Sequence, residues 1–459
     1  MIKSVSPIWT GTARGVVTRL VVLALLLVPA GPASAQRAEK LDFIRDAEIE
    51  HIIRGYARPI FQAAGIEPDS VEIVLIKDST VNAFVAGGMN MFFHTGLLIE
   101  CDNPEQLIGV IAHETGHIAG GHLIRGREAM EAASAEAILA MLLGVGAAVA
   151  SGQAGAGAAI ITGGQGMAMR NLLAFSRAQE ASADAAGMTF LERAHISPRG
   201  MHDFLEKLAG QEYLPPDRQV AYTRTHPVTH DRIDSVQHYL ESSPWKDAKL
   251  PAADNESFAR LKGKLIGFVK PALALRRYSP TDTSIAARYA LAIAYYQQGD
   301  LKTALPMIDE LIAREPNNPY FYELKGQVLM EYQRLPESLP PYRRSVALAP
   351  ESGLLRGALA QALIETNDPK NLEEALKNLQ FATRQEKSSS HLWRLVATAW
   401  GRKNKDAMVA YAMAEEALAR GDRAMARHQA ERAEKMLPAG SPEWLRAQDI
   451  RGVVDRPKN

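Results

Sequence analysis

The hydrophobic and polar positions along this chain of 459 residues follow three kinds of pattern. Residues 71–76 and 89–93 are short stretches rich in β-branched, aromatic and other apolar side chains, and they predict strands. Residues 107–112 form an uninterrupted apolar run that predicts a buried helix. From about residue 285 onward the pattern becomes helical and periodic. We therefore expect an α+β region followed by an all-α region.

The helical region contains internal repeats. Two segments carry a Gly-Asp pair, then an alanine and then a proline at the same offsets: Gly299-Asp300, Ala304, Pro316 and Gly421-Asp422, Ala426, Pro438. Pro316 and Pro350 lie 34 residues apart, which is the period of tetratricopeptide repeats. Stacked helix pairs of this kind form a superhelix with a concave binding surface. The array therefore predicts docking of substrates or of an assembly complex.

The predicted buried helix continues into residues 113–117, which read His-Glu-Thr-Gly-His. Residues four apart share a helical face, so His113 and His117 can hold one metal ion together. Zinc lowers the pKa of a bound water and polarises a peptide carbonyl, and Glu114 lies where its carboxylate can take the proton. This pattern predicts one zinc ion per chain, with Glu114 as catalytic base. Two histidines that only pair inside a core would show the same spacing.

A catalytic zinc site normally has three protein ligands, and two histidines leave it one short. The alanine-rich segment 176–187 favours a helix, and it places Glu180 and Asp184 on one face. Glu180 is our candidate for the third ligand. Asp184 is a candidate to orient a ligand imidazole by accepting a hydrogen bond from its other ring nitrogen. The alternative is an exposed helical face that happens to carry two acids.

Several motifs between residues 40 and 240 belong together: His-Glu-Thr-Gly-His at 113–117, Arg-Ala-Gln-Glu-Ala-Ser-Ala-Asp at 177–184 with Gly187, Thr225-His226-Pro227 before Asp231-Arg232-Ile233, and residues 81–84, 87–88 and 95–98. This combination resembles the gluzincin metallopeptidases that include HtpX and the CAAX prenyl endopeptidase, and especially their secreted members with a tetratricopeptide tail. The resemblance implies a zincin-like fold, Glu180 as third ligand, cleavage of misassembled outer-membrane proteins and a chaperone-like role during their insertion.

His226 precedes a proline, so we expect an extended or turn conformation there. Its imidazole has two candidate roles, as a removable fourth ligand or as a hydrogen-bond donor to the tetrahedral oxyanion. A histidine with a purely structural hydrogen bond is the alternative. Arg232 is a weaker candidate for the oxyanion role, and we interpret His94 and His122 as structural.

Strands that precede a zinc helix often offer an edge on which an extended substrate pairs by its backbone. Asn82, Ala83 and Phe84 are the candidate residues of such an edge. Substrate choice would then depend on an unfolded, accessible peptide. Strands that only complete a small sheet would show the same sequence pattern.

Residues 137–169 are two apolar arms joined by a Gly/Ala-rich segment, and each arm is too short to span a bilayer. Three interpretations remain open for this helical hairpin. It dips into a membrane surface as a peripheral contact, covers the active site as a lid, or packs against the peptidase core.

The N-terminus predicts export. Three cations precede the apolar residues 20–28, and Ala33-Ser34-Ala35 supplies a small-residue cleavage site. The formal net charge of zero gives no basic bias, so we expect no nucleic-acid partner. Cys101 is the only cysteine, which excludes an intramolecular disulfide. We expect a periplasmic protein, soluble or peripheral to the outer membrane.

The predicted organisation is a cleaved signal peptide at 1–35, a zinc metallopeptidase domain at 36–262, a linking segment at 263–284 and an all-α repeat solenoid at 285–459. The leading hypothesis is an exported zinc endopeptidase that hydrolyses misfolded or misassembled envelope proteins, with repeats that dock substrates or the outer-membrane assembly machinery. The alternative is a periplasmic scaffold or chaperone in which proteolysis is minor or shut off.

Overall fold

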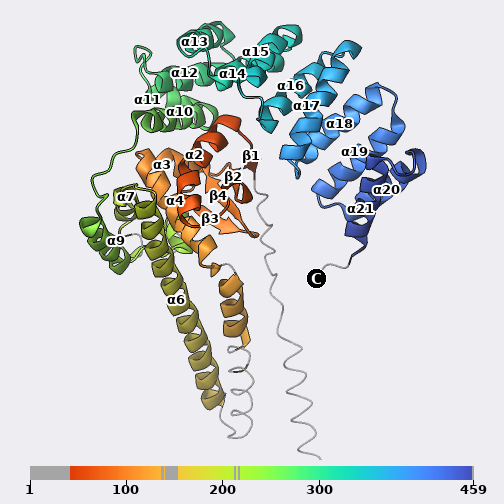
Figure 1. Cartoon of the computed structure of the whole chain (residues 1–459). Coiled ribbons are helices and arrows are strands. Elements are labelled where there is room, and N and C mark those ends of the chain that lie inside the picture. The colour runs from red at the N-terminus through yellow and green to blue at the C-terminus, as the bar shows by residue number, and fades with distance from the viewer. Residues whose placement is uncertain are drawn as a thin grey trace, which may run out of the picture. The chain divides into compact units, whose positions relative to one another are not determined.

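The computed structural model describes residues 42–122, 124–135, 139, 154–210, 213–215 and 218–456 (Figure 1). The predicted signal peptide at 1–35 and most of the first arm of 137–169 lie outside these residues. Two strand predictions are confirmed to within about a residue, since β2 spans Glu72–Ile76 and β4 spans Asn90–His94. The other strands are β1 (Phe43–Ile44) and β3 (Ala83–Ala86).

These strands form one sheet in the order β1-β2-β4-β3. The central strands β2 and β4 are parallel, while β1 and β3 run antiparallel to their neighbours. The two central strands alternate in burial, and Leu75 and Phe93 are fully buried. Helices cover the sheet because this apolar face needs a partner layer. In the described sheet, β3 pairs only with β4 and therefore lies at an edge.

The helices of this part are α2 (Ala47–Ala63), α3 (Thr95–Glu100), α4 (Pro104–Ala119), α6 (Ala154–Arg193), α7 (Arg199–Lys207), α8 (Ala221–Thr225) and α9 (His230–Ser242). The predicted buried helix is α4. Asn103 caps it by accepting a hydrogen bond from the Gln106 amide at 2.9 Å, and Pro104 occupies its first turn. Helices α2, α6 and α7 all contact α4, which is therefore the centre of the domain.

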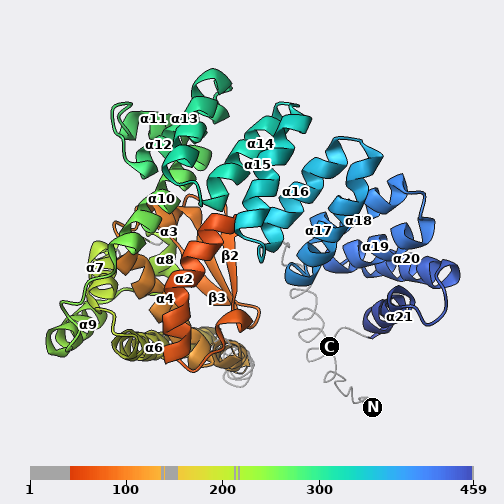
Figure 2. The same ribbon diagram turned by 45° about the horizontal axis from the view of Figure 1, so that its top comes forward.

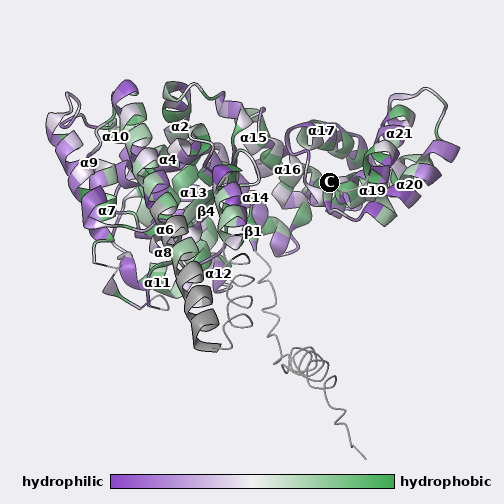
Figure 3. Cartoon of the chain, turned by 90° about the horizontal axis from the view of Figure 1, so that it is seen from below, coloured by the Kyte–Doolittle hydropathy of each residue, from purple (hydrophilic) through white to green (hydrophobic). Residues whose placement is uncertain are grey.

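Figure 3 shows that α7 and α9 both carry many hydrophilic residues.

Helix α6 is 40 residues long and joins two segments that the sequence analysis treated separately. Its N-terminal part contains the second arm of 137–169, and its C-terminal part carries Glu180 and Asp184. Figure 1 shows the N-terminal part extending well beyond α4. Among the described residues, no helix is both long enough and apolar enough to cross a membrane. Membrane contact or a lid role for residues 137–169 stays a prediction.

The all-α region follows as a row of helices stacked side by side (Figure 2): α10 (Ala252–Val269), α11 (Pro271–Arg277), α12 (Ile285–Gln297), α13 (Leu301–Arg314), α14 (Pro319–Glu331), α15 (Leu335–Leu348), α16 (Gly353–Glu365), α17 (Leu372–Gln385), α18 (Ser390–Arg402), α19 (Asp406–Ala419), α20 (Arg423–Met436) and α21 (Pro442–Asp455). Left-handed backbone recurs between helices at Gly299, Gln333 and Asn367, each 34 residues after the last. The predicted tetratricopeptide period is thus visible in the turns.

The peptidase part and the first repeats share a hydrophobic core, which includes Ile53 of α2, Leu265 of α10 and Ala290 of α12. The predicted boundary between residues 262 and 263 falls inside α10. A continuous helix therefore connects the two parts at the place where the sequence analysis put the end of the peptidase domain.

A buried ionic cluster joins α2 to this helix and to the first repeat. The Glu48 carboxylate is fully buried, and it accepts hydrogen bonds from Arg260 at 2.9 Å and from the Tyr289 hydroxyl at 2.8 Å. The Lys264 ammonium lies 2.8 Å from Asp46 and 3.4 Å from Glu48. Buried charges are expensive unless they are paired, so the four charged side chains of this cluster depend on one another.

We predict that Lys264→Met lowers the free energy of unfolding by about 3 kcal/mol, because it leaves buried carboxylates short of a cation. Urea denaturation followed by circular dichroism measures this. The matched control is Lys325→Met, which removes the partly exposed pair of Lys325 with Asp309 and is expected to cost about 1 kcal/mol or less. Equal losses in the two variants would contradict a special role for the buried cluster.

Candidate metal centre

Helix α4 presents His113, Glu114 and His117 inside the protein. His113 and Glu114 are at most 2% exposed, and His117 is 7% exposed. Their position in a regular helix puts the two imidazoles on one face at the i, i+4 spacing. The structure therefore contains the predicted buried helix, with the two histidines on one face.

Helix α6 brings Glu180 and Asp184 against that face. The two helices approach closely because small residues meet at their crossing. A Cβ atom added to Gly116 would lie 2.5 Å from the carbonyl oxygen of Ala183, and one added to Gly187 would lie 3.1 Å from the carbonyl oxygen of Ala112. Larger side chains would hold the helices apart and move both acids away from the histidines.

Four side chains converge on one point: His113, His117, Glu180 and His226. The Nε2 atom of His113 lies 3.1 Å from Nε2 of His117 and 3.3 Å from Nδ1 of His226. The Glu180 carboxylate lies 3.3 Å from His113, 3.4 Å from His117 and 3.2 Å from His226. All four side chains are buried.

These separations fit a tetrahedral metal site. Ligand atoms at 2.0–2.1 Å from a zinc ion in tetrahedral geometry lie about 3.3–3.4 Å from one another. Hydrogen bonds alone do not explain the cluster well, because three ring nitrogens face one another around a single carboxylate. Three imidazole nitrogens and one carboxylate oxygen are also a donor set that zinc accepts in proteins. The residues present therefore fit the metal that the sequence predicts.

Asp184 does not join the donor set but supports it. Its Oδ1 accepts a hydrogen bond from Nδ1 of His113 at 2.8 Å, which leaves Nε2 of that ring to face the cluster. Arg232 donates two hydrogen bonds to the same carboxylate, at 2.6 and 2.8 Å. The arrangement is the one that holds metal-ligating histidines in a fixed tautomer and ring orientation.

Arg232 is fully engaged at this position. Its Nη1 also donates to the carbonyl oxygen of Pro227 at 2.7 Å and lies 3.0 Å from Glu180, and the residue is 6% exposed. Its guanidinium thus pairs with both Glu180 and Asp184, and its single positive charge offsets one of their two negative charges. The oxyanion role considered for Arg232 finds no support in this geometry.

His226 follows the short helix α8, and its amide donates to the carbonyl oxygen of Tyr222 at 2.7 Å. The two rings stack, with centroids 4.7 Å apart. Nδ1 of His226 takes the fourth place in the donor set, while Nε2 lies 3.6 Å from Oε1 of Glu114. Both carboxylate oxygens of Glu114, and this Nε2, are buried without a hydrogen-bond partner among the described residues.

Burial and neighbouring charges set the protonation of the cluster. Burial lowers the pKa of His113, but hydrogen bonds to Asp184 and Glu180 outweigh it and raise the pKa to about 10. Burial lowers the pKa of His117 to about 4 and raises the pKa of Glu114 above its ordinary value. A histidine that binds a metal must be neutral, so metal binding here would displace a proton from His113.

The candidate substrate edge lies beside the histidine loop. Ala83 and Phe84 belong to the edge strand β3, and Phe84 stacks on Phe92 with ring centroids 4.9 Å apart. Asn82 precedes the strand, and its side-chain oxygen accepts a hydrogen bond from the Thr225 hydroxyl at 3.3 Å. Thr225 is the residue before His226, so the edge and the loop are physically connected.

His122, which we interpreted as structural from the sequence, is a direct neighbour of the cluster. Nδ1 of His122 lies 2.9 Å from Nδ1 of His117, so His122 contacts a predicted ligand directly. The spacing of five residues gave no helical signal for this contact. The pair Gly120-Gly121, which ends the helix, was the available signal. His94, by contrast, pairs with the Thr80 hydroxyl at 2.9 Å.

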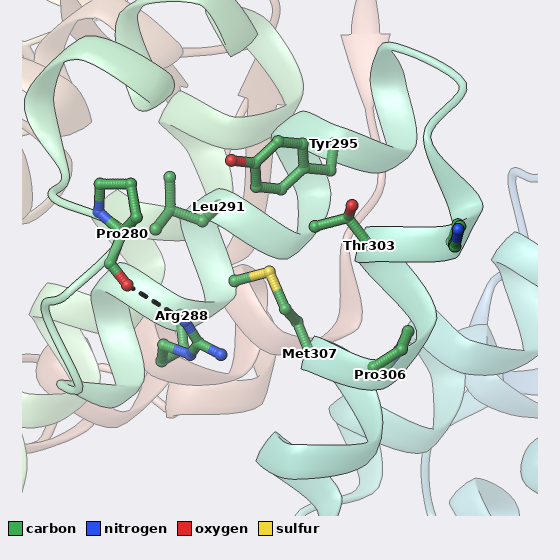
Figure 4. A pocket seen from close by; sticks show the side chains of 8 residues that line it. Pro280, Arg288, Leu291, Tyr295, Thr303, Pro306 and Met307 are labelled. Carbon is green, nitrogen blue, oxygen red and sulfur yellow. Dashed lines mark hydrogen bonds between the residues drawn. The ribbon is translucent and has the colours of Figure 1, made fainter.

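A separate groove lies in the first repeat (Figure 4). It has a volume of about 310 Å³ and is formed by residues before and within α12 and α13, including Arg288, Tyr295 and Met307. None of its lining residues belongs to the predicted metal site. The chemistry of the chain is therefore concentrated at α4, α6 and the loop after α8.

Comparisons with known proteins agree with this division. Residues 44–240 match peptidase family M48, and residues 273–328 match a tetratricopeptide repeat. The chain is similar to the beta-barrel assembly-enhancing protease of Yersinia pestis, with 25% identity over 67% of this chain and 64% of that protein. It is 26% identical to the protein of that name from Escherichia coli K12, over 71% of this chain and 66% of the relative.

The alignments thus span just under two thirds of the length of these two relatives. The metalloprotease LoiP of Escherichia coli K12 is 30% identical over 46% of this chain and 73% of its own length. These matches confirm the predicted kind of metallopeptidase, the α+β domain and the repeat region that follows it. The chain belongs to peptidase family M48.

Proposed function

We propose that this chain is an exported zinc-dependent endopeptidase that hydrolyses peptide bonds of misfolded or misassembled envelope proteins in the periplasm. The observation that carries the proposal is the convergence of four buried donors at 3.1–3.4 Å beside the Glu114 carboxylate, which has no hydrogen-bond partner among the described residues. A purely structural metal site has no use for such a carboxylate. Membership in a peptidase family supports the same reaction class.

In this proposal His113, His117 and Glu180 hold the zinc ion, with Asp184 behind His113. When bound, zinc would polarise the scissile carbonyl and lower the pKa of a water molecule. Arg232 keeps Asp184 ionised, since it holds the pKa of that carboxyl at about 2 against the effect of burial. Asp184 can then accept from His113 throughout the neutral pH range.

Glu114 is the proposed general base and proton shuttle. It follows His113 in the helix, and its buried carboxylate has no competing hydrogen bond among the described residues. The carboxylate removes a proton from the attacking water and then delivers it to the nitrogen of the leaving amine. Its raised pKa favours the second transfer, because a more basic carboxylate holds the proton between the two steps.

His226 is the proposed regulatory residue. Its Nδ1 fills the fourth position of the donor set, and the ring must leave before a substrate carbonyl can approach. In the oxyanion role the donor would be Nε2 of His226, which lies 3.6 Å from Oε1 of Glu114. Of the two roles considered from the sequence, we propose that of the removable fourth ligand, and the oxyanion role is the alternative that the His226→Ala variant tests.

The substrate class follows from the open edge of β3. An extended peptide that adds to this edge is held by main-chain hydrogen bonds, so an unfolded segment is favoured over a folded one. The names of the relatives point to proteins of the outer-membrane β-barrel class. The repeats would dock such substrates or the outer-membrane assembly machinery, and a chaperone-like role fits the same surface.

The second candidate function is a periplasmic scaffold in which proteolysis is minor or shut off. The observation that favours it is the position of His226, whose Nδ1 occupies the place in the donor set that a substrate carbonyl would need. The two functions differ in whether hydrolysis is needed in cells. A cell that depends on the protein but tolerates Glu114→Gln would support the scaffold.

We predict that Glu114→Gln keeps stoichiometric zinc and lowers kcat for casein by about 10²- to 10⁴-fold, since it removes the base and keeps the shape. Metal analysis and a casein cleavage assay measure the two properties. The control is Glu100→Gln, an exposed position at the end of α3, which should leave both unchanged. Full activity in Glu114→Gln would contradict the assigned base.

Zinc should also stabilise the fold. Adding zinc to chelator-treated protein at about 100 times its Kd should stabilise it by about 2.7 kcal/mol, because the native state alone assembles the donors. Differential scanning fluorimetry reports the shift in Tm. Glu180→Ala should reduce the shift, while Glu206→Ala, which changes a separate surface group of His202, Asp203 and Glu206, should not. If zinc raised the Tm of Glu180→Ala as much as it raises the Tm of wild type, Glu180 would not be a zinc ligand.

Opening the fourth position should activate the enzyme. If the closed arrangement holds about nine molecules in ten, His226→Ala should raise casein cleavage about tenfold. The matched control is His238→Ala, an exposed histidine on α9. A loss of activity with unchanged zinc affinity would assign His226 to the oxyanion instead.

A further inference from the structure

His117 needs a hydrogen-bond acceptor if it is to bind a metal. A neutral imidazole that offers the lone pair of Nε2 carries its proton on Nδ1, and this N–H must be satisfied because the residue is 7% exposed. For His113 the acceptor is the Asp184 carboxylate. Among the described contacts, no carboxylate faces Nδ1 of His117, since Glu180 lies on the Nε2 side of the ring.

The acceptor available to His117 is His122. Its Nδ1 lies 2.9 Å from Nδ1 of His117, and the two rings meet edge to face at 81° with centroids 4.9 Å apart. His122 is 5% exposed, so its ring is enclosed with its partner. Two Nδ1 atoms at this distance share one proton, and the metal-binding tautomer places that proton on His117.

Two glycines explain how a residue five positions later reaches back to this ring. Helix α4 ends at Ala119, and Gly121 has a φ of +62°, so the chain reverses at once. A Cβ atom on Gly120 would lie only 2.4 Å from Nε2 of His122, which means that the imidazole occupies the space a side chain would take. The absence of that side chain is what admits the ring.

The turn is also anchored to the helix that carries the third ligand. The Gln179 side-chain amide donates to the carbonyl oxygen of His122 at 3.2 Å, and Gln179 directly precedes Glu180 in α6. The position of His122 is thus fixed from both helices that supply the donor set.

We propose that His122 is a positioning residue of the metal centre, which accepts the Nδ1 proton of His117 and thereby aims Nε2 of His117 at the zinc ion. This inference rests on the proposed zinc site. It gives the two ligand histidines different supports, a carboxylate for His113 and a neutral imidazole for His117. A neutral acceptor adds no negative charge, so it leaves the ion a stronger Lewis acid than a second carboxylate would.

The test is zinc affinity of the purified full chain after removal of its signal peptide, measured by competition with a chromophoric chelator. His122→Leu removes the acceptor and should weaken binding about 10- to 100-fold. His122→Asn places an amide oxygen close to the position of Nδ1, so it should bind within about threefold of wild type. Gly120→Ala keeps the histidine but displaces its ring, and it should weaken binding as the leucine variant does.

Two further readouts separate positioning from folding. The Tm of each variant in excess chelator reports stability without metal, and we expect wild type and His122→Asn to agree. In the cobalt-substituted protein the visible absorption bands should shift in His122→Leu and stay unchanged in His122→Asn.

Wild-type affinity in His122→Leu would overturn the inference, and so would equal weakening in the leucine and asparagine variants. Unchanged affinity in Gly120→Ala would show that the glycine does not set the ring position. Failure of the wild-type protein itself to bind zinc would instead overturn the proposed function.

Discussion

The close approach of α4 and α6 is the constraint on which the metal centre depends. Neither helix holds a complete site, since α4 offers two imidazoles and α6 offers a carboxylate. They can approach closely because Gly116 and Gly187 have no Cβ atom, and the backbone of the opposite helix lies where that atom would be. The polar groups then face one another in a buried space, where unpaired charge is costly. A substitution that widened this crossing would separate the donors without touching any of them.

The polar groups around the crossing are linked to one another through Arg232. Arg232 supplies the positive charge for two carboxylates, and its other contact, the carbonyl oxygen of Pro227, ties it to the loop that carries His226. The loop that carries His226 is thereby attached to the side chains of α6 that face the histidines of α4. A second buried ionic cluster around Glu48 performs a different task, because it binds α2 to the first repeat and leaves the two parts of the chain with a common core.

The sequence predicted which of these side chains come together better than it predicted the groups that surround them. Helical spacing paired His113 with His117 and Glu180 with Asp184, and the structure brings these four together. Periodicity also predicted the repeats, which recur in the turns at Gly299, Gln333 and Asn367. Spacing could not predict the contact of His122 with His117, because it depends on a chain reversal after the helix. It also could not predict that Arg232 pairs with two carboxylates. The Glu48 cluster joins residues more than 200 positions apart, and no local pattern encodes it.

The central claim is that four side chains from three segments bind one zinc ion. X-ray absorption at the zinc edge, on the purified full chain without added metal, tests it most directly. The account predicts one tightly held zinc ion with three nitrogen ligands and one oxygen ligand at about 2.0–2.1 Å. A protein that holds no zinc, or zinc surrounded mainly by oxygen atoms at longer distances, would contradict it.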